Sequence, residues 1–149
     1  MTTKMKDTSK LERKFAPTAD GNSGTGFGVA DGRLAACPNK PNCVSSQAAS
    51  SDKQHYIEAL TYSGEPEKAR ERLELTIAGM KRERTIVREA NYWRAEFTSA
   101  LWRFVDDVEF LFDDNVRRID VRSASRVGYS DLGVNRRRTE EIRRRFSVR

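Results

Sequence analysis

The residues best able to do chemistry are concentrated between Arg122 and Arg138, in the sequence RSASRVGYSDLGVNRRR. Guanidinium groups alternate there with hydroxyl and small side chains, and guanidinium groups bind carboxylates and phosphates through paired hydrogen bonds. No nucleophile and base stand at a spacing that demands a catalytic pair. We therefore predict a non-catalytic site for an anionic small ligand or an acidic protein surface. Its candidate residues are Arg122, Ser123, Ser125, Arg126, Tyr129, Asp131, Asn135 and Arg136.

The predicted last helix supports this interpretation. Asn135 is a suitable N-cap, and the helix is predicted to run to about Phe146, burying Ile142 and Phe146. Three arginines at 136–138 fall in its first turn, where each cation costs about 0.3–1 kcal/mol because that end of a helix is already positive. Either the chain's own carboxylates compensate, or an external anion does. The nearby carboxylates are Asp131, Glu140 and Glu141.

The positive charge is concentrated in the same part of the chain. Residues 117–149 contain eleven arginines and four carboxylates, a net charge of +7, whereas the whole chain carries +6 and its remainder therefore −1. A localised basic surface favours an anionic partner more than diffuse basicity does. Nucleic-acid binding through Arg143, Arg144 and Arg145 is an alternative, although interleaved aromatics and a recognised nucleic-acid motif are missing. A solvated face that aids solubility is the alternative without a partner.

A hydrolase-type enzyme is the other alternative. It would need Ser123, Ser125 or a cysteine beside His55 or Asp131. His55 is the single histidine, and next to a tyrosine we expect it to be a hydrogen-bonded structural residue rather than a general base.

The two cysteines, Cys37 and Cys43, enclose the sequence CPNKPNC. Five residues separate them and two of these are proline, which limits the conformations of the loop and could hold the sulfurs close. A disulfide would imply an oxidising compartment. Reduced structural thiols remain open, as does zinc with His55 as third ligand, although this spacing fits no common structural zinc site. We predict no metal and no cofactor.

Hydrophobic periodicity predicts the elements that position these residues. Pro66 opens a helix that ends near residue 80, with apolar residues at spacings of three and four. A short extended segment is predicted at 56–62, before this helix. Extended segments follow at 84–89, 92–99, 108–112 and 116–122, and such short connections allow antiparallel neighbours only. We expect an α+β fold, with an antiparallel sheet of about four to five strands and two helices packed on one face.

Two short stretches between these strands are less regular. Asp106 and Asp107 could form an acidic pair, but we expect a turn or bulge, because adjacent strand residues point to opposite faces. Leu101, Trp102 and Phe104 are expected to continue in extended form or to wrap an edge.

The first 32 residues are predicted to be a flexible tail, followed by a single domain over 33–149. Five glycines lie between Gly21 and Gly32, and the run lacks the GK[ST] ending of a phosphate-binding loop, so we interpret it as a linker. No apolar stretch follows the N-terminal charges as in a secretory signal, and no run is long enough to cross a membrane. These features favour the cytoplasm; a Cys37–Cys43 disulfide would favour the periplasm or the thylakoid lumen.

Three motifs resemble one known family. They are CPNKPNCVSSQ, AEFTS followed by FVDDVEF, and VRSASRVGYSDLGVNRRR, and the resemblance covers roughly residues 27–146. The chain is identified on these motifs as similar to the domain of unknown function 1499, found in bacteria, cyanobacteria and plastid-bearing eukaryotes. The resemblance implies kinship without implying an activity. Because photosynthetic relatives are linked to thylakoids, it also implies association with photosynthetic membranes as one alternative.

Overall fold

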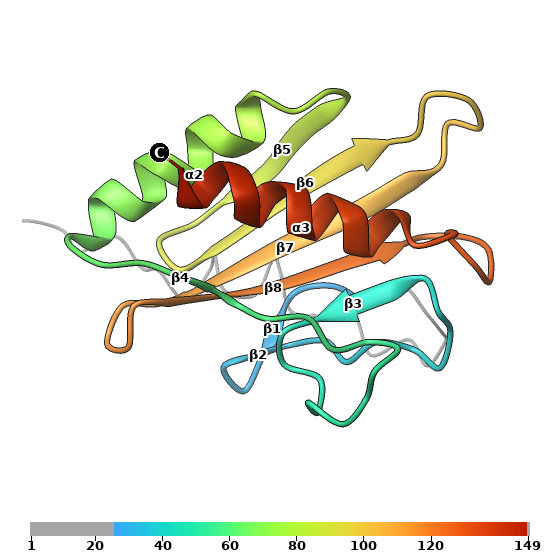
Figure 1. Cartoon of the computed structure of the whole chain (residues 1–149), viewed down its shortest axis with the longest axis horizontal. Coiled ribbons are helices and arrows are strands. Elements are labelled where there is room, and N and C mark those ends of the chain that lie inside the picture. The colour runs from blue at the N-terminus through green and yellow to red at the C-terminus, as the bar shows by residue number, and fades with distance from the viewer. Residues whose placement is uncertain (1–25, 149) are drawn as a thin grey trace, which may run out of the picture.

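The structure is a computed structural model that describes residues 26–148. The chain has an α+β fold in which a six-stranded antiparallel sheet carries helices α2 (Pro66–Ala78) and α3 (Val134–Ser147) on the same face (Figure 1). The predicted fold class, with two helices on one face of an antiparallel sheet, is confirmed. Within residues 26–148, no helix is both long and apolar enough to cross a bilayer.

The sheet has more strands than the four to five predicted, and its order is β3-β8-β7-β6-β5, with β4 also paired to β8. The two shortest strands both pair with β8: β3 pairs with 122–124 and β4 pairs with 118–119. Strand β4 lies within the extended segment predicted at 56–62, whereas the three residues of β3 are too few to show an alternation. The strands are β3 (Cys43–Ser45), β4 (Leu60–Thr61), β5 (Glu83–Arg88), β6 (Tyr92–Thr98), β7 (Val105–Asp113) and β8 (Arg118–Ser125).

The hydrophobic core lies between the helices and one face of the sheet. Pro66 begins α2, where its missing N–H has no intrahelical partner, and the helix buries Leu73 and Ile77. Helix α3 buries Ile142 and Phe146 from the same side. Alternation along the strands directs every second side chain into this layer. The buried strand residues there include Trp93, Ala95, Phe97, Val108, Phe110, Phe112, Ile119 and Val121.

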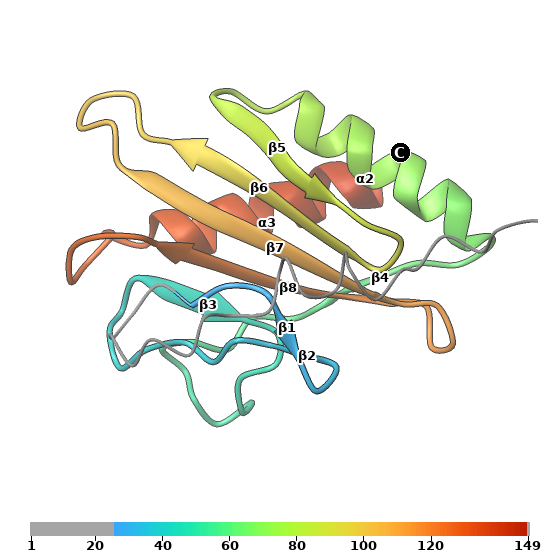
Figure 2. The same cartoon turned by 180° about the vertical axis from the view of Figure 1, so that it is seen from behind.

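Part of the predicted flexible tail packs on the other face of the sheet. β1 (Val29–Ala30) and β2 (Arg33–Leu34) form a hairpin that lies across the face opposite the helices (Figure 2). Gly32 supplies the positive φ, 71°, that the tight turn requires. The prediction of a tail over residues 1–32 is therefore wrong for its last seven residues, 26–32. Residues 1–25 lie outside the described part of the chain.

The turn or bulge expected at Asp106 and Asp107 is also absent from the described structure, because both residues lie within β7 and both are buried. Their side chains point to opposite faces, as alternation requires. Asp106 binds Arg138 of helix α3 with an Nη2–Oδ2 distance of 2.8 Å, whereas Asp107 binds arginines on the far face.

Candidate functional site

Strands β6, β7 and β8 present charged side chains on the face of the sheet that is turned away from the helices. We call this set the polar face. Its residues alternate with the core residues, so that each strand is apolar on one side and charged on the other. The polar face consists of Arg94, Glu96, Asp107, Glu109 and Arg122, with Arg126 at the end of β8.

Glu109 and Arg122 form the most buried pair of the polar face. They are 0% and 2% exposed, and Arg122 Nη1 lies 3.1 Å from Glu109 Oε2. Glu109 Oε1 also accepts hydrogen bonds from the Gly28 backbone N–H at 2.6 Å and the Tyr92 hydroxyl at 2.8 Å. Burial raises the pKa of Glu109, and the Arg122 guanidinium opposes that shift. Both carboxylate oxygens therefore accept hydrogen bonds from the protein itself.

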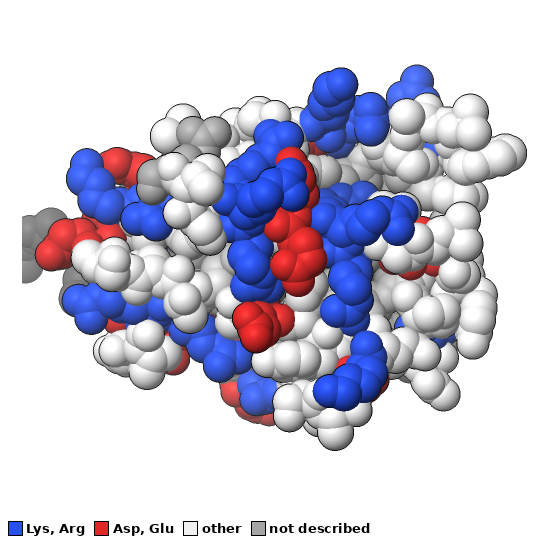
Figure 3. Space-filling model, viewed as in Figure 1, with Lys and Arg blue, Asp and Glu red and all other residues white. Residues whose placement is uncertain are grey.

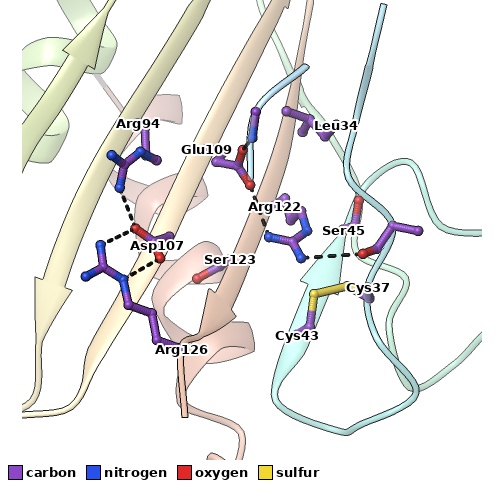
Figure 4. A network of polar contacts seen from close by, with 12 residues as sticks. Leu34, Cys37, Cys43, Ser45, Arg94, Asp107, Glu109, Arg122, Ser123 and Arg126 are labelled. Carbon is purple, nitrogen blue, oxygen red and sulfur yellow. Dashed lines mark hydrogen bonds and ion pairs between the residues drawn. A yellow bond between two sulfur atoms is a disulfide. The ribbon is translucent and has the colours of Figure 1, made fainter. Parts of the chain in front are cut away.

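Asp107 is the centre of the second cluster (Figure 4). Its carboxylate accepts from Arg94 Nη1 at 2.7 Å and from Arg126 Nε and Nη2 at 2.8 and 2.9 Å. Arg126 also binds Glu96 at 2.5 Å. Hydrogen bonds from the Arg126 guanidinium to Asp107 raise the pKa of Arg126 further. The two positive and two negative groups of this cluster balance.

The segment before β3 covers the polar face. Arg122 Nη2 reaches the Ala36 carbonyl oxygen at 3.4 Å, and Figure 4 shows Cys37 and Cys43 beside that arginine. Cys37 and Cys43 are joined by a disulfide with an S–S distance of 2.04 Å, which ties the covering segment to β3. The buried Nε of Arg122 has no hydrogen-bond partner among residues 26–148. No cysteine of the chain is left as a free thiol.

The predicted serines lie on the opposite face of β8 from Arg122. Ser123 Oγ donates to Asn135 Oδ1 at 2.6 Å, and Asn135 Nδ2 donates to Ser125 Oγ at 2.9 Å. Asn135 Nδ2 also lies 2.7 Å from Asp131 Oδ2. Asn135 and Ser123 are 1% and 0% exposed. This network joins the end of β8 to the start of α3, and its buried members Ser123 and Asn135 are closed to a ligand.

Asp131 compensates the positive end of helix α3 from within the chain. Its carboxylate accepts from the backbone N–H groups of Gly133 and Asn135 at 2.8 and 3.0 Å. The N-cap is Gly133, with φ of 79°, so the prediction of Asn135 as N-cap is wrong. Asn135 instead lies inside the first turn, where its side-chain amide forms hydrogen bonds with Ser123 and Ser125 of β8.

The three arginines at the start of α3 reach different acceptors. Arg136 donates to the carbonyl oxygens of Tyr56 and Gln54 at 2.9 and 3.1 Å, and Arg137 donates to the Leu132 carbonyl at 2.7 Å. Arg138 binds Asp106. The eight predicted site residues therefore do not converge on one pocket. Arg122 and Arg126 lie on the polar face, the serines and Asn135 on the helix side, and Tyr129 is exposed in the loop between β8 and α3.

The groups proposed for catalysis are separate in the described structure. His55 Nδ1 contacts Asp52 Oδ2 at 2.7 Å, and His55 Nε2 contacts the Lys40 carbonyl at 2.8 Å and the Gln54 amide at 3.0 Å. The hydrogen bond from His55 lowers the pKa of Asp52. Within residues 26–148, the partners of the His55 ring include neither Ser123 nor Ser125, and both cysteines are in the disulfide. A pocket of about 180 Å³ opens beside His55 and Asp52, lined also by Arg33, Ser45 and Gln47.

The arginines proposed for nucleic-acid binding also have partners. Arg143 binds Glu140 at 3.0 Å and the Ala59 carbonyl at 2.8 Å. Arg144 and Arg145 both bind Glu141, and these contacts lower the pKa of that carboxyl. Much of the charge in the basic run is thus paired on the helix itself. Among the described residues, no three His, Cys, Asp or Glu side chains are grouped in a way that could hold a metal ion.

One end of the sheet carries a feature that the sequence reasoning missed. Ten large hydrophobic side chains are exposed in the described chain, and six of them lie in the β6–β7 loop and the β8–α3 loop. We call these six residues the apolar end. Figure 3 shows a largely uncharged surface where Figure 1 places the two loops. The six residues are Leu101 (78% exposed), Trp102 (70%), Phe104 (50%), Val127 (55%), Tyr129 (67%) and Leu132 (84%).

The two loops are neighbours in space. The Arg126 backbone N–H donates to the Val105 carbonyl at 3.1 Å, which continues the β7–β8 pairing by one residue. Phe104 and Val127 follow directly on these two adjacent chains. The sequence signal was available: Leu101, Trp102 and Phe104 form a large apolar run without alternation, interrupted only by Arg103. Such a run fits neither a half-buried strand nor a polar turn.

Cations surround the apolar end. Lys81 and Arg82 precede β5 beside the end of β6, because Arg82 Nε donates to the Thr98 carbonyl at 3.0 Å. Arg103 lies between Trp102 and Phe104, and Arg137 contacts the Leu132 carbonyl. All four cations are exposed, and none forms an ion pair with a carboxylate of residues 26–148. The nearby carboxylates of Asp106, Asp107 and Asp131 are already engaged.

Comparison with known proteins places this architecture in a family. A search of curated proteins found no match. A family model described as a protein of unknown function, DUF1499, matches residues 33–146. This range includes the disulfide, the six-stranded sheet, helix α2, all of helix α3 except its last residue, and both loops of the apolar end. Because the match covers most of the chain and the motifs described above, the chain belongs to the DUF1499 family.

Proposed function

We propose that this protein is a non-catalytic binding module whose apolar end recognises a negatively charged partner surface. One observation carries the proposal: six exposed large apolar side chains and four exposed cations without ion pairs lie together at one end of the sheet. Soluble monomers rarely expose a large contiguous apolar patch unless it binds something. The cations supply the preference for a partner of opposite charge.

The closed state of the polar face supports the same conclusion. A small anion at Arg122 would have to displace the carboxylate of Glu109, because both residues are at most 2% exposed. The displaced carboxylate would then be buried without its arginine, which costs about 3–5 kcal/mol. An anionic ligand at the Arg/Ser cluster, and association with photosynthetic membranes, stay predictions.

In this proposal the predicted site residues act as supports. Ser123, Ser125 and Asn135 fix one end of the β8–α3 loop, and Asp131 fixes the other through the first turn of α3. Arg103 and Leu132 hold positive φ angles of 57° and 54°, which cost non-glycine residues about 1 kcal/mol each. A loop held in place before binding loses less conformational entropy when its partner arrives.

Position-specific photo-crosslinking tests the proposal. A benzoylphenylalanine at position 101 places the reactive group at the apolar end, and the same residue at position 75 places it on exposed Leu75 of helix α2, a matched control at 58% exposure. Irradiation of cells that naturally express the protein is expected to give an adduct, with protein or lipid, at position 101 and not at 75. Equal adducts at both positions, or none at 101, would overturn the proposal.

A further inference from the structure

We infer that the partner surface is an anionic lipid bilayer, into whose headgroup region the two loops of the apolar end insert. This inference rests on the proposed function and names its partner. It starts from the side chains that the loops expose. Trp102 and Tyr129 combine an apolar ring with a polar N–H or O–H group, the combination that settles where hydrocarbon meets headgroups. Leu101 and Leu132 are the most exposed of the six.

The shape of this end also favours a bilayer. Both views of the chain show the β6–β7 and β8–α3 loops extending past the ends of their strands on the same side of the molecule (Figures 1 and 2). Projecting tips on two separate loops can enter a deformable surface together. A rigid protein partner would need two depressions at matching positions.

The charges are placed as membrane insertion requires. Arg103 is adjacent to Trp102 in the loop, so its long side chain can lie along the apolar residues while its guanidinium reaches a phosphate. Arg137, Lys81 and Arg82 surround the tips at the level of the strand ends. Cations in this position are attracted by anionic headgroups over about one Debye length.

Co-sedimentation with vesicles tests the inference directly. The full chain is mixed with phosphatidylcholine vesicles containing about 30 mol % phosphatidylglycerol, or with pure phosphatidylcholine vesicles, at about 0.1 M salt. Binding to the anionic vesicles is expected to be about tenfold tighter or more. Phospholipids brominated on their acyl chains are expected to quench Trp102 fluorescence. Trp93, the other tryptophan, is only 5% exposed and is out of reach of the lipid.

Three variants separate insertion from general attraction. Leu101→Ser with Trp102→Ser should weaken vesicle binding about tenfold or more, because the apolar contribution is lost. Arg103→Glu with Arg137→Glu should remove the preference for anionic lipid. Leu75→Ser, a matched change at an exposed leucine on α2, should change neither. Circular dichroism and thermal melting confirm that each variant is folded before its binding is compared.

Each contrary result identifies a different error. Absence of binding to anionic vesicles overturns the bilayer inference. If position 101 still crosslinks to a protein in cells, the proposed function stands without the bilayer. Binding without bromine quenching means surface attraction without insertion, and also overturns the inference. Concentration-dependent dimerisation that Leu101→Ser with Trp102→Ser abolishes would assign the apolar end to a second copy of the chain instead. No vesicle binding and no position-101 crosslink would overturn both proposals.

Discussion

On the polar face, Glu109 and Arg122 are 0% and 2% exposed, whereas at the apolar end Leu101 and Trp102 are 78% and 70% exposed. Charged residues of the polar face are thus buried, whereas some of the largest apolar residues of the described chain are exposed. Each buried charge forms an ion pair or a hydrogen bond with a group of the same chain. The exposed apolar residues are left open to solvent by the rest of residues 26–148. A cluster of arginines in a sequence therefore indicates a binding site only when carboxylates of the same chain do not pair with them in the folded structure.

The difference has an energetic basis. A buried ion pair contributes little net stability, but removing one member leaves an uncompensated charge in a medium of low polarity. Such pairs therefore constrain the arrangement of strands and covering segment. An exposed apolar side chain contributes little to folding, because it stays in water. Substitutions should accordingly affect stability on the polar face and binding at the apolar end.

The largest expected effect is that of Glu109→Gln. The change leaves the Arg122 guanidinium buried without its counterion, so the free energy of unfolding should fall by about 3–5 kcal/mol, as measured by urea denaturation. Glu67→Gln on the exposed surface of α2 is the matched control and should change it by less than about 0.5 kcal/mol. The double variant Glu109→Gln with Arg122→Met should recover part of the lost free energy of unfolding. If Glu109→Gln alone causes no loss, the Glu109–Arg122 pair does not stabilise the fold.

A smaller effect is expected from the disulfide. Replacing Cys37 and Cys43 by serine removes the constraint on a short loop, and chain entropy puts the loss at about 2 kcal/mol. The covering segment should also become easier to detach from the polar face. Amide hydrogen exchange at Gly28, whose N–H donates to Glu109, measures this release. Unchanged exchange at Gly28 would show that the covering segment is held without the disulfide.

The smallest expected effect is at an exposed ion pair. Arg70 and Tyr62 donate to Asp114, and these hydrogen bonds, that from Arg70 first, lower the pKa of Asp114 below its ordinary value of 3.8. The stabilisation is therefore present above pH 4 and is lost as pH falls through the lowered pKa. Because the side chain is 38% exposed, solvent screens the pair, and Asp114→Asn should cost about 0.5 kcal/mol at pH 7. Denaturation midpoints of the two proteins should converge near pH 2 to 3; a constant difference down to that pH would contradict this origin.

Much of the fold follows from the sequence. Hydrophobic periodicity predicts the helix from Pro66, the four long strands and the final helix. Alternation along the strands places their core residues on one face of the sheet. Strand β4 lies within the short extended segment predicted at 56–62. Strand β3 has no such signal, because pairing with β8 at a long separation in sequence determines it. The packing of residues 26–36 on the sheet likewise depends on Glu109 and Arg122, whose neighbours in space are distant in sequence.

The candidate site was less predictable, for a related reason. Arg122 and Ser123 are adjacent in sequence but lie on opposite faces of β8, so a cluster of residue types did not become a cluster in space. Glu109 and Asp107, which pair with the arginines, lie on the neighbouring strand, and only the strand register brings them together. The apolar end could have been found from Leu101, Trp102 and Phe104, whose run fits no alternation.

The most direct test compares one variant from each region by two quantities. These are the affinity for vesicles, measured under conditions where both variants are folded, and the midpoint of unfolding. Leu101→Ser with Trp102→Ser should bind vesicles containing phosphatidylglycerol about tenfold more weakly with an unchanged unfolding midpoint. Glu109→Gln should show the reverse, full affinity in its folded form and a lowered midpoint. Loss of affinity in folded Glu109→Gln, with affinity retained in the loop variant, would contradict the division between a structural polar face and a binding apolar end.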